Sequence, residues 1–164
     1  MIVWLGKALV LAIHDRQLAE HGGSVGVRDE TLLESALARP QQLFAYGDPV
    51  PDLAELAANL AFGLGLARNH PFVDGNKRTA YVAYRTFLAL NDIELVASDE
   101  EKYLTMLALA EGKLSETDFA AWLRAHIQSN TRNQVHESRG GYKAKSAGQS
   151  SVRRKPRLVR SRTF

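Results

Sequence analysis

The chain contains no cysteine, which excludes a disulfide framework and a metal centre built from thiolates. It has no apolar run long enough to cross a bilayer, and its N-terminal segment is too weakly basic and its apolar run too short for a signal peptide. These absences predict a cytoplasmic protein with no membrane partner. What is present, 164 residues of which 45% are hydrophobic, suits one ordinary globular domain.

Apolar residues recur with the helical period through most of the chain, which predicts an all-α bundle of about six helices. The first helix is expected to end near residues 21–23 and to carry the apolar stripe Leu5, Leu9, Ala12 and Ile13. The second is expected to open at Asp29, to be closed by Pro40, and to carry Leu32, Leu33, Ala36 and Leu37. The third presents Leu56, Leu60, Leu64 and Ala67.

The helix after residue 75 is apolar on two faces, so we expect it to be the central buried helix; the faces are Tyr81, Tyr84 and Leu88, and Ala83, Phe87 and Leu90. Two more helices follow, each with a capping-box start, Ser98 with Glu101 and Ser115 with Asp118, and Gly112 is expected to separate them. Only residues 93–96 have the pattern of a strand.

The C-terminal part of the chain differs in composition. Residues 129–164 hold ten Lys or Arg and one acidic residue, a net charge of +9, so residues 1–128 carry −6 of the total of +3. With few large apolar residues, this segment is predicted to be a disordered basic tail following a domain of residues 1–128. The tail has the charge for weak contact with nucleic acid, but a solvated extension without a defined partner is the preferred interpretation.

The most informative stretch, residues 70–80, reads His-Pro-Phe-Val-Asp-Gly-Asn-Lys-Arg-Thr-Ala. It places Lys77 and Arg78 side by side where a helix is expected to begin. The positive end of the helix dipole disfavours cations there, so the pair indicates a bound anion. Free backbone N–H groups at a helix start are suited to phosphate. We therefore predict a phosphate site at this turn.

The neighbouring residues fit that interpretation. Gly75 allows the backbone to approach a ligand closely, and Asn76 has an amide that donates to a phosphoryl oxygen. Asp74 is placed to hold a hard cation such as Mg²⁺. His70 titrates near neutrality, which suits a general base for a hydroxyl nucleophile.

Each residue also has a structural explanation: Asp74 as an N-cap, His70 as a structural histidine, and residues 76–78 as solvated surface. The conjunction over residues 70–80 favours the nucleotide site.

At these positions the chain resembles the Fic/Doc (Fido) superfamily, whose motif runs His-Pro-Phe-x-Asp/Glu-Gly-Asn-Gly-Arg-x-x-Arg. The matching residues are His70, Pro71, Phe72, Asp74, Gly75, Asn76 and Arg78. The resemblance extends through residues 14–15, 21–23 and 28–30 and the Asn69 lead-in to about residue 127. It implies a compact helical catalytic domain with the motif loop between two core helices.

Two positions depart from the motif. Lys77 stands where AMP-transferring members have a second glycine, and Tyr81 stands where they have a second arginine. The form found here is similar to the death-on-curing (Doc) branch, the toxins of toxin–antitoxin pairs. That resemblance implies a protein Ser/Thr kinase using ATP and Mg²⁺, because a lysine side chain suits the terminal phosphate. An AMP-transferase and a non-catalytic nucleic-acid-binding module are the alternatives.

The resemblance also implies roles. His70 and Lys77 would be catalytic; Gly75, Asn76, Lys77 and Arg78 would bind the phosphates; Asp74 would hold the metal. The target in the Doc branch is the elongation factor that delivers aminoacyl-tRNA, and a cognate antitoxin inhibits in trans by folding a helical segment into a groove. The self-inhibitory helix motif of other Fic proteins is not found, because Leu107 occupies the Ser/Thr position before Glu111 and Gly112.

One other pair carries titratable groups. His14 and Asp15 match part of a metal site of the His-Asp type, but such a site needs further ligands, and His21 and His126 are not suitably arranged. A buried hydrogen-bonded pair or a helix surface is the preferred interpretation.

Overall fold

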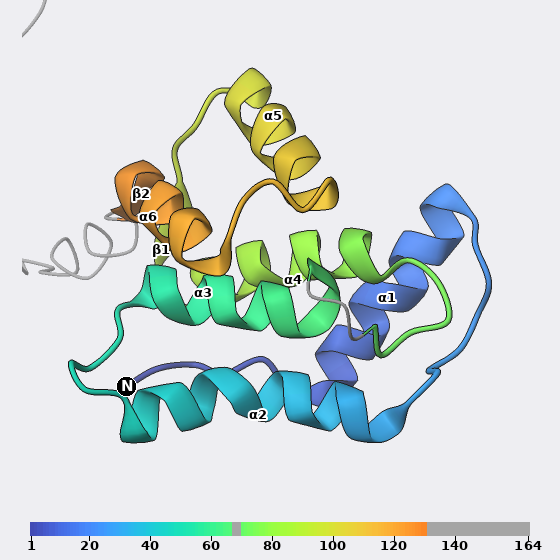
Figure 1. The fold of residues 1–164 in the computed structure, drawn as a ribbon. Helices are drawn as coiled ribbons and strands as arrows, with labels where there is room; N and C mark the ends of the chain where they lie inside the picture. Colours follow the sequence, from blue (N-terminus) through green and yellow to red (C-terminus); the bar gives the residue numbers. More distant parts are fainter. Residues whose placement is uncertain (67–69, 131–164) are drawn as a thin grey trace, which may run out of the picture. The chain divides into compact units, whose positions relative to one another are not determined.

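The structure is a computed structural model, and it describes residues 1–66 and 70–130. The part of the chain that it describes contains six α-helices, a π-helix and a two-stranded sheet (Figure 1). In chain order these are α1 (Lys7–His21), α2 (Glu30–Tyr46), α3 (Leu53–Ala61), η1 (Phe62–Leu66), α4 (Asn76–Leu90), β1 (Ile93–Leu95), α5 (Asp99–Ala110), α6 (Glu116–His126) and β2 (Ile127–Ser129). The prediction of a helical bundle is confirmed. None of these helices is long and apolar enough to cross a membrane.

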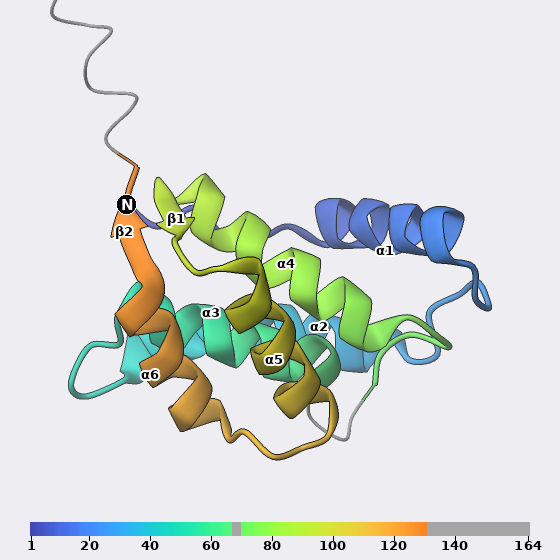
Figure 2. The same cartoon turned by 90° about the horizontal axis from the view of Figure 1, so that it is seen from above.

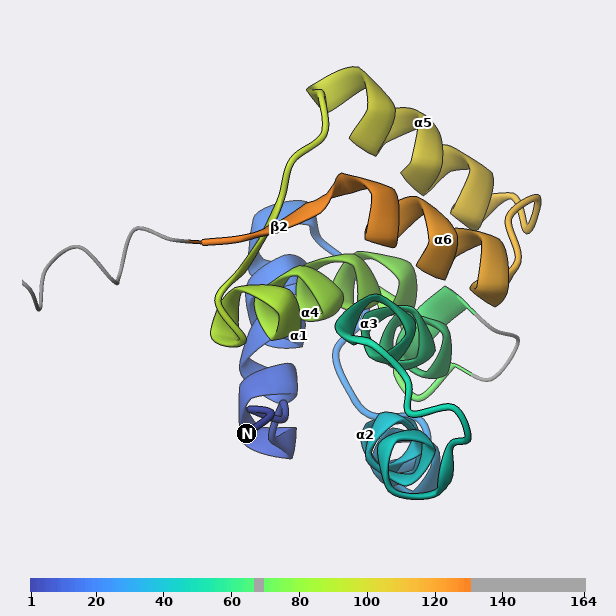
Figure 3. The same ribbon diagram turned by 90° about the vertical axis from the view of Figure 1, so that its left-hand side faces the viewer.

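Helix α3 lies at the centre of the helices and contacts α2, α4 and α6 (Figures 1 and 3). It is buried all round, since Ala54 and every residue from Leu56 to Ala61 are buried. Helix α4 is buried on both predicted faces, at Tyr84 and Leu88 on one and at Ala83 and Phe87 on the other; only Leu90, at its end, is wrong, with 41% exposed. Alanines explain why α3 is buried more completely: four small side chains in α3 let neighbouring helices approach from every side.

Helix α1 lies next to α4 (Figure 2) and turns a different face to the core than the sequence indicated. The buried residues of α1 are Val10, Ile13, His14, Gln17 and Leu18. Leu9 is 39% exposed and Ala12 is exposed, so this part of the predicted stripe is wrong. The apolar pattern of the sequence did not reveal this face because two of its buried residues, His14 and Gln17, are polar.

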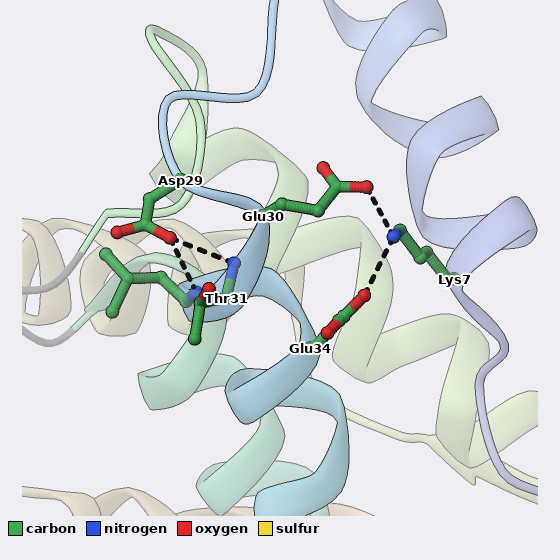
Figure 4. Close-up of polar contacts among 6 residues, drawn as sticks. Lys7, Asp29, Glu30, Thr31 and Glu34 are labelled. Atoms are coloured by element: carbon green, nitrogen blue, oxygen red, sulfur yellow. Dashed lines mark hydrogen bonds and ion pairs between the residues drawn. The ribbon is translucent and has the colours of Figure 1, made fainter.

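Helix α2 begins where predicted but continues past Pro40. Asp29 caps the helix by accepting hydrogen bonds from the backbone N–H groups of Thr31 and Leu32, a contact typically worth about 1 kcal/mol (Figure 4). The expectation that Pro40 closes the helix is wrong. A proline inside a helix costs roughly 3 kcal/mol. The last turn offsets this through Leu43 at the core and through Phe44, whose ring centroid lies 5.9 Å from that of Trp4.

One cation ties α1 to the start of α2. The ammonium of Lys7 forms ion pairs with Glu30 and Glu34, and the bond to Glu34 measures 3.1 Å (Figure 4). The hydrogen bonds from Lys7 to Glu30 and then to Glu34 raise the pKa of Lys7. The link joins the first turn of α1 to the first turns of α2.

The predicted third helix changes to a π-helix at Phe62, and its expected last residue, Ala67, lies outside the described residues, as does Asn69. Gly65 makes the following close approach possible. A Cβ atom at Gly65 would overlap the carbonyl group of Asn76 and would lie 3.0 Å from the backbone nitrogen of Lys77. Only glycine lets η1 reach the beginning of α4 at this distance.

The remaining predictions concern the C-terminal elements. The Ser98–Glu101 capping box is confirmed; Ser115 caps α6 by accepting from the Asp118 N–H, and Gly112 follows the end of α5 with a φ of +69°. The predicted strand is β1, and its antiparallel partner β2 was not predicted. Ser129 pairs with Ile93, so the sheet reaches past the predicted boundary at residue 128. Residues 131–164, most of the predicted tail, lie outside the described part.

Candidate active site

The motif turn leads into α4 through a left-handed glycine. Gly75 is the N-cap of α4, with a φ of 73° and a ψ of 14°, and no side chain caps the helix. The Gly75 carbonyl accepts from the N–H of Thr79 at 2.9 Å, so the helix begins properly without a capping side chain. Its first N–H groups are thus left for an anion, as the sequence predicted.

Asp74 is not the N-cap. Its carboxylate accepts from the N–H of Gly75 at 2.6 Å and from that of Ser24 at 3.2 Å. These two hydrogen bonds, followed by the charge of Arg78, lower the pKa of Asp74, so the side chain is ionised at neutral pH. No group of three or more His, Asp or Glu side chains suited to a metal occurs among the described residues. A single ionised carboxylate fits Mg²⁺, which keeps waters and nucleotide oxygens as its other ligands.

His70 lies at the edge of the same turn and is half-buried. Its Nδ1 atom is buried and has no hydrogen-bond partner in the described structure. Burial, and then the charges of Arg28 and Lys77, lower the pKa of the imidazole. The ring is therefore neutral at pH 7 and is able to accept a proton.

The two cations are held by backbone carbonyls. Lys77 Nζ donates to the carbonyl oxygen of Ala110 at 2.7 Å, and Arg78 Nη2 donates to that of Gly22 at 3.1 Å. Within residues 1–66 and 70–130, neither forms an ion pair with a carboxylate within 4 Å. Both keep further N–H donors, and Arg78 acts on the carboxylate of Asp74 through its charge and not through a direct ion pair.

Asn76 has a role in the turn that the sequence did not reveal. Its Oδ1 accepts from the N–H of Phe72 at 2.8 Å, and its Nδ2 donates to the carbonyl of Phe72 at 2.9 Å. The amide thereby closes the turn on itself. One hydrogen of Nδ2 remains for the predicted contact with phosphate.

All the predicted site residues line one cavity. Its volume is about 260 Å³, and its walls are formed by His70, Val73, Asp74, Gly75, Asn76, Lys77 and Arg78. The structure thus brings together a neutral base, an ionised carboxylate, two cations and a helix start. Two larger cavities, of about 520 and 420 Å³, are lined by other residues and contain none of these groups.

A smaller, mainly apolar cavity of about 100 Å³ adjoins the first, because Lys77 and Arg78 line both. Tyr81 and Tyr84 from α4 and Met106 and Leu109 from α5 supply most of its wall. Tyr81, one of the two departures from the family motif, therefore contributes an aromatic surface beside the cations.

The segment before α2 is hydrogen-bonded to the motif turn. This contact was not predicted from the sequence. The backbone of the segment pairs with residues 71–73: the N–H groups of Arg28 and Asp29 donate to the carbonyl of Pro71 at 2.7 and 3.1 Å, and the N–H of Val73 donates to that of Gly26 at 3.0 Å. The glycines at 22, 23 and 26 were the available signal for an irregular backbone here.

His14 was also underestimated. The sequence favoured a buried hydrogen-bonded pair of His14 and Asp15, or a helix surface. His14 is buried and hydrogen-bonded, but its partner is Thr79, and Asp15 is exposed.

Comparison with known proteins decides the family. A profile of the Fic/DOC family matches residues 4–88, which is half of the chain and includes the whole motif turn. The chain belongs to the Fic/DOC family.

Two relatives are similar to it. "Toxin Doc" of Mycolicibacterium smegmatis is 50% identical over 76 residues, which cover 46% of this chain and 57% of that protein. "Protein kinase doc" of Escherichia phage P1 is 35% identical over 115 residues, 70% of this chain and 88% of that protein. The predicted family is therefore confirmed, and the names agree with the Doc branch and with a Doc-type kinase.

Proposed function

We propose that this Fic/DOC protein is the toxin of a toxin–antitoxin pair and acts as a protein kinase, transferring the γ-phosphate of ATP to a Ser or Thr hydroxyl. One observation carries the proposal: the cavity that holds His70 and Asp74 also holds two cations that form no ion pair within 4 Å to any carboxylate of the described residues. The names "Toxin Doc" and "Protein kinase doc" of its relatives support it.

In the proposed reaction, His70 accepts the proton of the target hydroxyl. The hydroxyl oxygen forms a bond to the γ-phosphorus, the bond from that phosphorus to the bridging oxygen breaks, and ADP leaves with the electron pair. Lys77, Arg78 and the N–H groups after Gly75 stabilise the charge on the transferring group, which is where most of the catalysis arises in phosphoryl transfer.

Asp74 is the residue proposed to hold Mg²⁺. When bound, the ion would neutralise charge on the nucleotide phosphates. The hydrogen bonds from Ser24 and Gly75 orient the carboxylate of Asp74 and keep it ionised, so this chain supplies an oriented anionic oxygen for the ion.

Lys77 favours phosphate transfer over AMP transfer. The side chain of Lys77 lines the cavity that contains His70 and Asp74. Its ammonium group extends toward α5 and donates to the carbonyl oxygen of Ala110. A compact charge in this place suits a terminal phosphate, which carries more charge than a phosphate inside the nucleotide chain. ATP labelled at the γ- or the α-phosphate tests this choice: only the γ-label should reach the target, whereas transfer of the α-label would indicate an AMP-transferase.

The proposed target is the elongation factor that delivers aminoacyl-tRNA, and the proposed inhibitor is a cognate antitoxin with a helical segment. Helix α5 offers a surface for that segment. It exposes Tyr103, Leu104, Met106 and Leu107, each at least 40% exposed, and it borders the apolar cavity beside Lys77. An amphipathic helix lying there would cover both the apolar side chains and the mouth of the site.

A further inference from the structure

His14 is a buried polar residue whose place the proposed reaction does not yet explain. It belongs to α1, is 2% exposed, and its Nδ1 atom lies 3.1 Å from the hydroxyl oxygen of Thr79 in α4. Its ring is stacked on that of Phe72, with centroids 3.9 Å apart and planes inclined by 12°. One side chain of α1 thus contacts both the motif turn and the helix that follows it.

The same ring lies beside the glycine of the turn. A Cβ atom added at Gly75 would lie 3.6 Å from Cε1 of His14, so a side chain at position 75 would touch the ring. His14 itself contacts the turn before Asp74 through Phe72 and the helix after it through Thr79.

Packing alone does not account for a histidine here. The Nε2 atom is buried and has no hydrogen-bond partner in the described structure, which is unfavourable for a polar atom. A phenylalanine would fill a similar volume and stack on Phe72 without leaving that atom unpaired. What histidine adds is the bond to Thr79, a link between α1 and the first turn of α4.

Burial lowers the pKa of His14, and Arg78 nearby acts in the same direction against the opposing effects of Asp15 and Asp74. The ring is therefore neutral at pH 7. A neutral ring stacks on Phe72 without the desolvation cost of a buried cation, so the contact with the turn is compatible with burial.

We propose that His14 is a positioning residue: by bonding to Thr79 while stacking on Phe72, it fixes residues 72–79 so that Asp74, Lys77 and Arg78 meet the nucleotide in one geometry. It does not touch the nucleotide. The proposal rests on the proposed phosphotransfer, in which small displacements of charged groups cost rate, about 100-fold for 1 Å.

The test compares full-length variants by their kcat and KM for ATP and by their Tm. His14→Phe keeps a ring for stacking, Thr79→Val removes only the hydroxyl, and Thr79→Ser restores it. We expect His14→Phe and Thr79→Val each to lower kcat about tenfold or more with KM changed less than about threefold, and the double variant to be no worse than either single one. Thr79→Ser should retain most of the rate.

Val10→Ala is the matched control, because Val10 is a fully buried residue of the same helix that belongs to the core and has no contact with the turn assigned to it. It should lower Tm with kcat unchanged. The positioning role is wrong if His14→Phe and Thr79→Val keep kcat within about twofold of the unmodified protein. It is also wrong if their loss of kcat equals that of Val10→Ala when the variants have the same Tm. Should His14→Phe not fold, Thr79→Val and Thr79→Ser decide alone.

A readout without catalysis separates this proposal from the proposed function. The ring signals of His70 in proton–nitrogen NMR spectra should shift in Thr79→Val and not in Val10→Ala, since His70 has no direct contact with Thr79 among the described hydrogen bonds. Unshifted His70 signals would overturn the positioning role even in an active kinase. A protein that transfers no phosphate but shows these shifts would refute the proposed function and leave the positioning of the turn intact.

Discussion

The ammonium of Lys77 lies 2.7 Å from the carbonyl oxygen of Ala110, the last residue of α5. Carbonyl groups at a helix C-terminus carry partial negative charge and attract cations. This contact holds the lysine without neutralising it, because a carbonyl dipole is weaker than a carboxylate charge. The side chain is thus held at the wall of the cavity that also contains His70 and Asp74, and it still has two N–H donors to offer.

Replacing Lys77 by methionine should therefore lower kcat/KM for phosphotransfer by about 100-fold, the typical loss when one charge-stabilising donor is removed. The fold should be preserved, since Lys77 is exposed. Steady-state kinetics with labelled ATP measures the loss, and Lys102→Met, a change at an ion-paired lysine of α5 outside the site, is the control. Equal rates for Lys77→Met and the control would contradict the role of Lys77.

His70→Ala should reduce transfer by about 100- to 10,000-fold, because the other proton acceptor among the residues that line the cavity, Asp74, is assigned to Mg²⁺ in the proposed reaction. The pH dependence carries a second expectation. Since the folded-state pKa of His70 is lowered, the base remains neutral to a lower pH than an ordinary histidine, and the rate should fall only below about pH 6.5, the usual value.

Arg28→Ala removes a charge that lowers this pKa. The acid limb of the pH–rate profile should then move to higher pH, while Arg16→Ala, at an exposed arginine paired with Glu20, should leave it in place. A shift to lower pH, or the same profile in all three proteins, would be inconsistent with His70 as the base.

Asp74→Asn should raise the Mg²⁺ concentration needed for half-maximal rate by on the order of tenfold, about 1.4 kcal/mol of binding free energy. The N–H groups of Gly75 and Ser24 bind different oxygens of the carboxylate, so the amide keeps an acceptor for one of them and lacks the charge that attracts the ion. Mg²⁺ titrations of the initial rate measure the effect, with Asp99→Asn at a fully exposed position as the control. An unchanged Mg²⁺ requirement would remove Asp74 from the metal site.

Gly65→Ala should destabilise the protein by about 1–3 kcal/mol, because its Cβ atom would overlap the backbone of Asn76 and push η1 away from the motif helix. Activity should fall beyond what the loss of stability explains, since the displaced backbone carries the N–H groups that are proposed to bind phosphate. Thermal unfolding and kinetics are compared with Gly6→Ala, which has open space around it. Matching Tm values for the two variants would show that the close approach is not required.

Much of the site could be predicted from sequence because it is local. The left-handed Gly75, the uncapped start of α4 and the Asp29 and Ser98 caps depend on residues within a few positions of one another. The functional residues likewise follow one another in a single turn, and the structure brings all of them to one cavity.

What could not be predicted depends on contacts between distant residues. Pro40 continues a helix because the turn beyond it packs on the core, and β2 forms only because β1 is beside it. The buried face of α1 includes His14, which has its bonding partner 65 positions later in the chain. Asn76 was predicted to contact the ligand, yet both atoms of its amide bond to the backbone of Phe72. That contact depends on how closely the folded turn brings the two residues together.

The antitoxin surface gives a further prediction. Leu107→Asp places a charge on the exposed apolar side of α5 and should weaken inhibition by the cognate antitoxin by about tenfold or more, with the uninhibited rate unchanged. Inhibition curves measure this, and Leu9→Asp, at a similarly exposed leucine of α1, is the comparison. Equal inhibition of both variants would place the antitoxin elsewhere.

The most direct measurement is transfer of label from ATP to the purified elongation factor in the presence of Mg²⁺. We expect the γ-phosphate label, and not the α-phosphate label, to become bound to a Ser or Thr of the factor, and His70→Ala to abolish the signal. Transfer of the α-label, or γ-label transfer that survives in His70→Ala, would contradict the proposed reaction.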